Sequence, residues 1–176
     1  DNLREDSQGD KKIGTTRRGI GPCYEDKVAR RGLRMGELFY PELIKESLES
    51  TIATYNEYFQ KMYGSDTYAF SVIFDQLMKC ADDLKPFICD TTDLIHDHIS
   101  EGKRLLFEGA QGAILDIDHG TFPYVTSSNT VAGAACTGAG IGPTCIDKVI
   151  GISKSYCTRV GSGPFPTEID DDVGVY

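Results

Sequence analysis

Apolar residues recur every three or four positions through the middle of the chain. The clearest run consists of Ile44, Leu48, Ile52, Tyr55, Phe59 and Met62. This spacing predicts an amphipathic helix over 41–63. Pro41 suits a first helical turn, and Gly64 suits the position just after a last one. We expect the aromatic and methionine side chains of this helix to be core residues rather than cofactor contacts.

Three further helices follow from the same kind of pattern. One is predicted over 68–84, and Pro86 stops it. A shorter one begins near Thr92, a candidate N-cap, and ends at Gly102. Upstream, a short helix is predicted over 24–34. It would carry a cationic face made by Lys27, Arg30, Arg31 and Arg34.

The pattern changes after residue 102. The apolar run 105–107 is followed by a stretch rich in glycine, hydroxyl and amide side chains, which indicates a buried strand that leads into a ligand-contacting loop over 108–130. Residues 148–159 alternate well enough for a second strand. Between them, small residues over 130–142 predict a closely packed helix. Its Gly-x-Gly-x-Gly spacing lacks the preceding strand that a dinucleotide fingerprint needs.

Composition is that of an ordinary globular protein, with 176 residues, 40% hydrophobic and 26% charged. No apolar run approaches a membrane span, and no secretion signal is recognisable. Six cysteines without a C-x-x-C pair exclude zinc spacing, and we expect free thiols in a reducing cytoplasm rather than disulfides. Both ends look cut, and we expect residues 1–12 to be mobile unless residues upstream order them.

Charge is unevenly distributed along the chain. The formal net charge of −9 argues against a nucleic-acid partner, yet residues 11–34 hold eight basic side chains against two acidic ones. Such an island suits a compact polyanion such as a nucleotide phosphate. The alternatives are a solvated cationic loop and bases that pair with acids elsewhere. The glycine-rich segment 14–22 offers backbone N–H groups to an anion, but it is not a Walker loop.

Two groups of polar residues in the 108–130 loop could carry chemistry. Gln111 lies between two glycines, and its amide could recognise a heterocycle, although a turn glutamine is also commonly structural. Asp116 and Asp118, followed by His119, could form a carboxylate pair or a metal site. We favour the alternative that these carboxylates fix the loop by hydrogen bonds to backbone N–H groups.

Four segments in this order, IGTTRRGIGPCYEDKVARRGLR, EGAQGAILDIDHG, VTSSNT and TRVGSGPFPTE, resemble the central part of adenylosuccinate synthetase. This family joins L-aspartate to IMP with GTP. The resemblance covers the chain from Ile13 onward and implies an α/β fold with a mostly parallel central sheet, partial here, and an inserted helical subdomain. We predict a phosphate-contacting and dimer-contact segment over 1–34, a helical subdomain over 35–102, and part of the sheet over 103–176, all within one domain truncated at both ends.

The resemblance implies specific roles. Thr16 and Thr126 match threonines that contact the IMP phosphate, and Gln111 matches the glutamine that binds the hypoxanthine edge and steadies the 6-phosphoryl intermediate. Arg30 matches an arginine that reaches the IMP site of a neighbouring subunit, which implies a homodimer. Lys27 matches a signature lysine near the substrate phosphates, and with Gln111 it completes the predicted catalytic set.

The family's GTP loop, guanine and aspartate sites, catalytic base and Mg²⁺ ligand would lie outside these residues, so we expect the fragment alone to be inactive and to hold no metal. One departure concerns Arg17, where bacterial members usually have glycine and some other members have a base. Arginine does not easily adopt positive φ, so the resemblance does not define the loop shape around Thr16. The competing hypothesis is a non-catalytic α/β module for anion binding or dimerisation.

Overall fold

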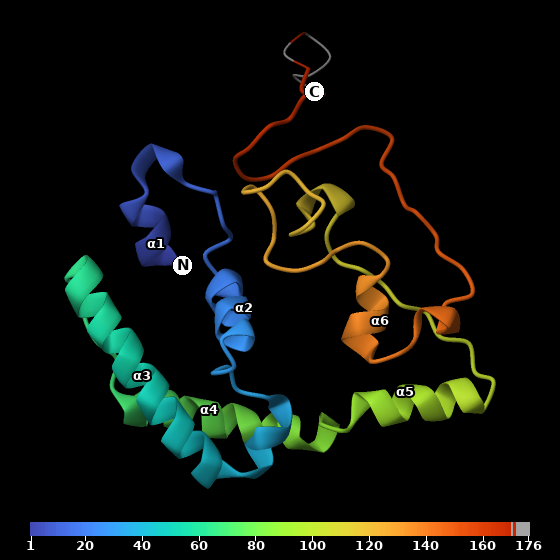
Figure 1. Ribbon diagram of the computed structural model, residues 1–176. Helices are drawn as coiled ribbons and strands as arrows, with labels where there is room; N and C mark the ends of the chain where they lie inside the picture. The colour runs from blue at the N-terminus through green and yellow to red at the C-terminus, as the bar shows by residue number, and fades with distance from the viewer. Residues whose placement is uncertain (170, 172–176) are drawn as a thin grey trace. The chain divides into compact units, whose positions relative to one another are not determined.

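The computed structural model describes residues 1–169 and 171 of the chain. Its α-helices are α1 (Asn2–Ser7), α2 (Ile20–Val28), α3 (Pro41–Tyr63), α4 (Phe70–Leu84), α5 (Thr91–Ser100) and α6 (Ala134–Ala139), as drawn in Figure 1. Short 3₁₀ helices are η1 (Gly9–Lys11), η2 (Met35–Phe39), η3 (Lys85–Phe87), η4 (Ala113–Leu115) and η5 (Pro143–Cys145). The chain divides into two compact units, one formed by Gly21–Leu94 and the other by Asp1–Ile20 together with the residues from Ile95 onward.

The Gly21–Leu94 unit contains the helices that the apolar periodicity predicts. α3 begins at Pro41 and ends at Tyr63. Gly64 follows with φ of 59° and donates its N–H to the carbonyl of Gln60. Glycine suits this left-handed position because it has no Cβ to clash with the preceding turn. Both predicted boundaries of the helix are therefore confirmed.

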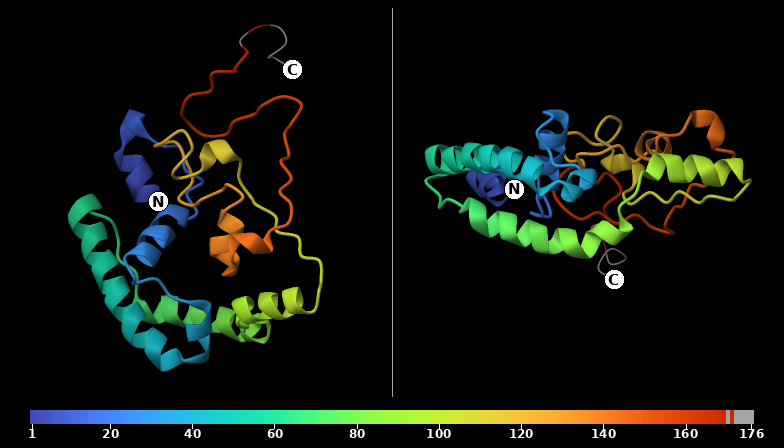
Figure 2. Two further views of the ribbon diagram at one scale, coloured as in Figure 1. Left: turned by 45° about the vertical axis from the view of Figure 1, so that its right-hand side comes forward. Right: turned by 90° about the horizontal axis from the view of Figure 1, so that it is seen from below.

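α3 and α4 pack against each other around a small apolar core (Figures 1 and 2). Its buried members are Leu38, Ile44, Leu48 and Ala81, with Ile52, Phe70, Ile73, Phe74, Leu77, Met78 and Ile88 partly buried around them. At the α3–α4 connection, the side-chain amide of Asn56 donates to the carbonyl of Tyr68 and accepts the N–H of the same residue, each at 2.8 Å. Met62 is 63% exposed, so its predicted core position is wrong.

Two predicted helices have different ends. α2 ends at Val28, so Arg30, Arg31 and Arg34 lie beyond it and the predicted cationic helix face does not form. α5 begins at Thr91, and its first turn is capped by Asp90, whose Oδ1 accepts the N–H groups of Thr92 at 3.0 Å and of residue 93 at 3.2 Å. The proposed Thr92 cap is wrong, because an aspartate carboxylate immediately before the helix serves these orphan N–H groups.

The first twelve residues are ordered by helical structure, contrary to our expectation of a mobile end. α1 and η1 occupy most of this segment, and Glu5 of α1 is only 5% exposed. The small-residue segment 130–142 forms only the six residues of α6, which ends at Gly140 with φ of 71°. Glycine at that position terminates the helix earlier than the composition predicts.

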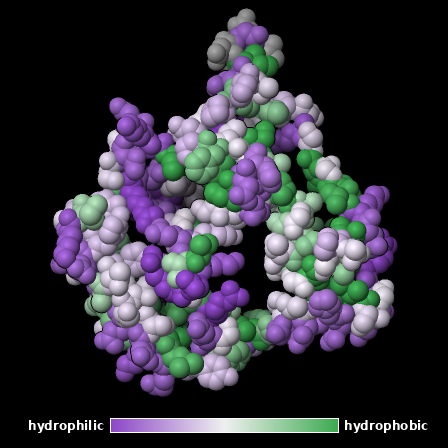
Figure 3. Space-filling model, in the orientation of Figure 1, coloured by the Kyte–Doolittle hydropathy of each residue, from purple (hydrophilic) through white to green (hydrophobic). Residues whose placement is uncertain are grey.

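The described residues contain no β-strand, so neither predicted strand is present. Segments 105–107 and 148–159 run as irregular chain, and several apolar side chains along or beside them lie in solvent. Exposure reaches 87% at Leu106, 95% at Ile152 and 94% at Val160, and hydrophobic residues are visible on the face shown in Figure 3. A strand requires a hydrogen-bonded neighbour, and no described segment supplies one. The central sheet therefore stays a prediction.

Candidate functional site

The 108–131 segment is built around one buried carboxylate. Asp116 is fully buried and accepts backbone N–H groups from both sides of the loop. The donors are Asp118 at 2.9 Å, His119 at 3.1 Å, Thr130 at 2.5 Å and Val131 at 3.2 Å. The Asn129 side-chain amide adds a bond at 3.3 Å. For Asp116, these bonds support the loop-fixing alternative over a catalytic carboxylate pair.

The charge of Asp116 follows from the same bonds. Burial alone would raise the pKa of this carboxyl, but hydrogen bonds from the four backbone N–H groups stabilise the ionised form by more, and the net pKa is well below its ordinary value. Asp118 is exposed and accepts the Asn129 amide at 2.6 Å. Asp116 and Asp118 therefore both help to hold the turn, and they share Asn129.

Three more bonds pair the two sides of this loop. The N–H of Thr126 donates to the carbonyl of Leu115 at 2.9 Å, and the N–H of Ile117 donates to the carbonyl of Ser128 at 3.2 Å. The Thr130 hydroxyl donates to the carbonyl of Gly112 at 3.0 Å. Gln111 directly precedes Gly112 in the chain and is exposed. Gln111 and Thr126 are therefore held on one loop assembly.

Gly120 allows the chain to reverse inside this assembly. Its N–H donates to the carbonyl of Asp116 at 2.8 Å, and the next N–H, of Thr121, donates to the carbonyl of Ile114 at 3.0 Å. A Cβ on Gly120 would lie 2.2 Å from the Ile114 oxygen. Only glycine permits so close an approach between the two backbone segments.

Arg159 connects the loop assembly to the later glycine-rich segment. Its guanidinium donates to the Thr121 hydroxyl at 3.2 Å, to the Tyr124 carbonyl at 3.2 Å and to the Ser162 carbonyl at 2.9 Å. Residue-by-residue reading of the sequence did not single out this arginine. The only available signal was a base placed directly before the glycine-rich VGSGP turn. Two of its partners, Thr121 and Tyr124, lie 38 and 35 positions earlier in the chain.

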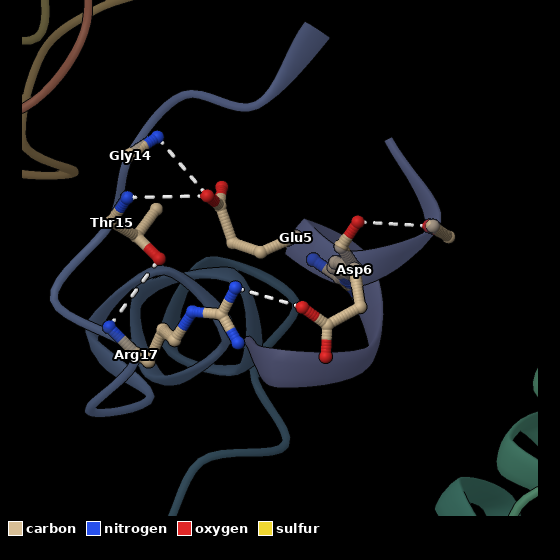
Figure 4. A network of polar contacts seen from close by, with 7 residues as sticks. Glu5, Asp6, Gly14, Thr15 and Arg17 are labelled. Carbon is tan, nitrogen blue, oxygen red and sulfur yellow. Dashed lines mark hydrogen bonds and ion pairs between the residues drawn. The ribbon is translucent and has the colours of Figure 1, made fainter. Parts of the chain in front are cut away.

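The glycine-rich segment around Thr16 packs on the same turn. A Cβ on Gly14, which has φ of 78°, would lie 2.9 Å from the Ser162 backbone nitrogen. On the other side, the Glu5 carboxylate accepts the N–H of Gly14 at 3.0 Å and that of Thr15 at 3.4 Å (Figure 4). Thr16 is exposed beside these contacts. A chain of direct contacts thus runs from the Thr16 loop through Ser162 and Arg159 to the assembly that holds Gln111 and Thr126.

Arg17 does adopt the conformation that the sequence made doubtful. Its φ is 57°, and its N–H donates to the Thr15 hydroxyl at 3.4 Å. Its guanidinium pairs with the Asp6 carboxylate at 2.7 Å (Figure 4). Left-handed backbone is unfavourable for an arginine. The ion pair and the hydroxyl contact show how α1 and Thr15 hold this residue in place.

Lys27 and Arg30 belong to the Gly21–Leu94 unit. The Lys27 ammonium lies 5.7 Å from the centroid of the Tyr24 ring, a cation–π distance. Arg30 is exposed and has φ of 63°. Arg17 and Arg30 are the two non-glycine residues with positive φ among residues 1–169 and 171. Strained backbone of this kind concentrates at functional sites, which makes both arginines candidates for function.

Within the described residues, no group of three or more His, Cys, Asp and Glu side chains is arranged to hold a metal ion. In the same part of the chain, no helix is both long enough and apolar enough to cross a membrane.

Comparison with known proteins decides the family. A family model described as adenylosuccinate synthetase matches residues 1–176. The chain belongs to the adenylosuccinate synthetase family. An adenylosuccinate synthetase of Heliobacterium modesticaldum is 53% identical over 174 residues, and one of Pseudomonas aeruginosa is 54% identical over 176 residues. These alignments cover 99% and 100% of this chain, respectively.

A solved structure of the same family shares the fold. The structure of fully ligated adenylosuccinate synthetase from Plasmodium falciparum is 38% identical, with a TM-score of 0.87 over 99% of this chain and 40% of its own. The chain spans 41% of the length of the two bacterial relatives.

Proposed function

We propose that this chain is the central part of a GTP-dependent ligase that joins L-aspartate to IMP and yields adenylosuccinate, GDP and phosphate, a step of AMP biosynthesis. Family membership over all 176 residues is the observation that carries this proposal. In the proposed reaction the γ-phosphoryl group of GTP moves to the 6-oxygen of IMP. The aspartate amine then attacks carbon 6, and phosphate leaves.

The loop assembly supports an IMP-binding role. Thr16 would offer its hydroxyl and backbone N–H to the IMP phosphate, and hydrogen bonds to an ionised group are stronger than neutral ones. Thr126 would offer its hydroxyl, because its N–H already donates to the Leu115 carbonyl. Gln111 would bind the hypoxanthine edge through its amide, which both donates and accepts. It would also stabilise charge on the 6-phosphoryl intermediate. The contacts through Ser162 and Arg159, which connect the segments carrying these residues, favour a shared task.

Arg30 is proposed to reach the IMP phosphate bound by a second copy of the chain, so that the enzyme works as a homodimer. Lys27 is proposed to lie near the substrate phosphates and to take part in catalysis with Gln111. The predicted division into segments 1–34, 35–102 and 103–176 stays part of this proposal. So does a cytoplasmic location for the protein.

Two parts of the proposed enzyme are expected to lie outside the chain. The first comprises the Mg²⁺ ligands, the catalytic base and the GTP and aspartate sites. The second is the remaining part of a mostly parallel sheet, whose strands would pair with segments 105–107 and 148–159. The exposed apolar side chains along or beside these segments, among them Leu106 and Ile152, support such pairing.

The test uses the complete natural protein that contains this chain, with substitutions at two exposed glutamines, Gln111 and Gln76. Gln111→Ala should lower kcat for adenylosuccinate formation by roughly 100-fold or more, as loss of a group that stabilises transition-state charge does. Gln76→Ala, on α4, should leave it unchanged. Calorimetric titration with IMP, with and without GTP, completes the test. A complete protein that neither binds IMP nor forms adenylosuccinate would instead favour the non-catalytic anion-binding or dimerisation module.

A further inference from the structure

The turn after α2 holds Arg30 in a conformation that arginine does not favour. The N–H of Arg30 donates to the carbonyl of Lys27 at 3.1 Å. The following N–H groups, of Arg31 and Gly32, both donate to the carbonyl of Asp26 at 3.0 and 3.1 Å. Arg30 therefore occupies the left-handed position at the end of a helix, where glycine is usual. Something in the surroundings has to stabilise an arginine there.

The Asp26 side chain supplies that stabilisation. Its Oδ1 accepts the Nε–H of Arg31 at 2.6 Å and the hydroxyl of Tyr55 at 2.8 Å. Arg31 also lies 3.6 Å from the Glu25 carboxylate. Tyr55 is on α3, so the turn is braced against the longest helix of its unit. A tyrosine hydroxyl, with an ordinary pKa of about 10, is protonated at neutral pH and can donate to Asp26. Burial, followed by this hydrogen bond, raises the pKa of Tyr55 further.

Neighbouring arginines therefore have different surroundings. Arg31 pairs with carboxylates of its own unit, and the side chain of Arg30 makes no ion pair or hydrogen bond with residues 1–169 and 171. Arg30 is exposed on a turn whose backbone is fixed on both sides of it. This arrangement suits a cation that binds an anion from outside its unit, since a preorganised side chain loses less freedom on binding.

We propose that Asp26, Arg31 and Tyr55 form a positioning network that presents the Arg30 guanidinium to an anionic ligand bound by a second copy of the chain. This proposal rests on the proposed role of Arg30 in the function above. The network residues are positioning residues and do not touch the ligand. Removing the brace would let the Arg30 turn relax toward more favourable backbone conformations and so lower the occupancy of the binding orientation.

The experiment removes one hydroxyl at a time in the complete natural protein. Tyr55→Phe keeps the ring, which packs 5.7 Å from that of Phe59, and deletes only the donor to Asp26. Tyr58→Phe is the matched control on the same helix, because its hydroxyl contacts that of Tyr63 rather than the network. We expect Tyr55→Phe to raise the KM for IMP about 3- to 10-fold, equivalent to roughly 0.7–1.4 kcal/mol, with kcat nearly unchanged. Tyr58→Phe should leave the KM for IMP unaltered.

A double-substitution cycle separates positioning from simple stability. If Tyr55 acts through Arg30, adding Tyr55→Phe to Arg30→Leu should not raise the KM beyond that of Arg30→Leu alone. A Tyr55→Phe protein that melts at a lower temperature but keeps its IMP affinity would overturn the network. If Arg30→Leu itself leaves IMP affinity unchanged, the proposed role of Arg30 fails and the network fails with it. If only Arg30→Leu weakens binding, the network alone is wrong.

Discussion

Adding a single methyl group at Gly120 should destabilise the loop of the candidate site. Gly120→Ala would place a Cβ 2.2 Å from the Ile114 carbonyl oxygen and 2.5 Å from that of Asp116. Real Cβ atoms essentially never approach other atoms within 3.0 Å, so the two segments must separate by about 0.8 Å or more. Both obstructing atoms belong to the backbone and cannot rotate away.

The cost of that separation can be worked from the bonds it disturbs. Overpacking a tight site costs about 1–3 kcal/mol. The obstructing oxygens also accept the N–H groups of Gly120 and Thr121. Weakening both hydrogen bonds adds about 1 kcal/mol each. We therefore expect Gly120→Ala to destabilise the protein by about 3–5 kcal/mol, estimated from these two terms.

Urea denaturation of the complete natural protein measures this change, with Gly138→Ala as the matched control. Gly138 lies in α6, and a Cβ there would meet nothing within 4 Å beyond its chain neighbours and its own helix backbone. Alanine at such a helical position should stabilise by about 0.4–1 kcal/mol. A Gly120→Ala protein as stable as the parent would refute the close approach of the 114–116 backbone to Gly120, and with it the geometry of the loop.

Three other predictions concern the site and the core. The pKa of Asp116 is lowered in the folded state, so the ionised carboxylate stabilises the protein fully above the unfolded pKa of about 3.9, and this stabilisation is lost progressively at lower pH. Asp116→Asn should flatten this part of the profile of unfolding free energy against pH, measured by urea denaturation between pH 2.5 and 7. Gly14→Ala should weaken IMP binding in a calorimetric titration, because its Cβ would strike the backbone it packs on, whereas Gly9→Ala, also at positive φ but in open space, should not. Ile44→Ala, at a position 1% exposed, should cost about 2–5 kcal/mol in thermal or urea unfolding, while Leu43→Ala, 60% exposed, should cost far less.

Local patterns predicted the helices of the Gly21–Leu94 unit well. The spacing of Ile44, Leu48 and their neighbours is a property of one segment, and α3 forms where that spacing extends. Helix ends were less predictable. The end of α2 depends on backbone bonds to Asp26, and the start of α5 depends on the Asp90 carboxylate. In both cases several neighbouring residues could have ended or begun the helix, and the spacing of apolar residues does not distinguish between them.

Contacts between distant segments were the hardest to predict. The sequence indicated that the 108–130 loop matters, and it raised the possibility that its carboxylates hold backbone. It gave no indication that Asp116 would accept two N–H groups from 14 and 15 positions away. The role of Arg159 was not predicted for the same reason, because its partner Thr121 is 38 positions earlier. The predicted strands depend on neighbours that no local pattern supplies.

The hydrogen bond from the Thr130 N–H to the Asp116 carboxylate limits how far this loop can change in length. A carboxylate that reaches both its own turn and a segment 14 positions away fixes how much chain lies between them. Inserting a residue into 119–128 would leave either the near or the far N–H groups without an acceptor. A substitution that changes only a side chain, at positions other than Gly120, Thr121 and Thr126, leaves these backbone bonds in place. Natural variants of this loop should therefore differ by substitution and not by insertion or deletion.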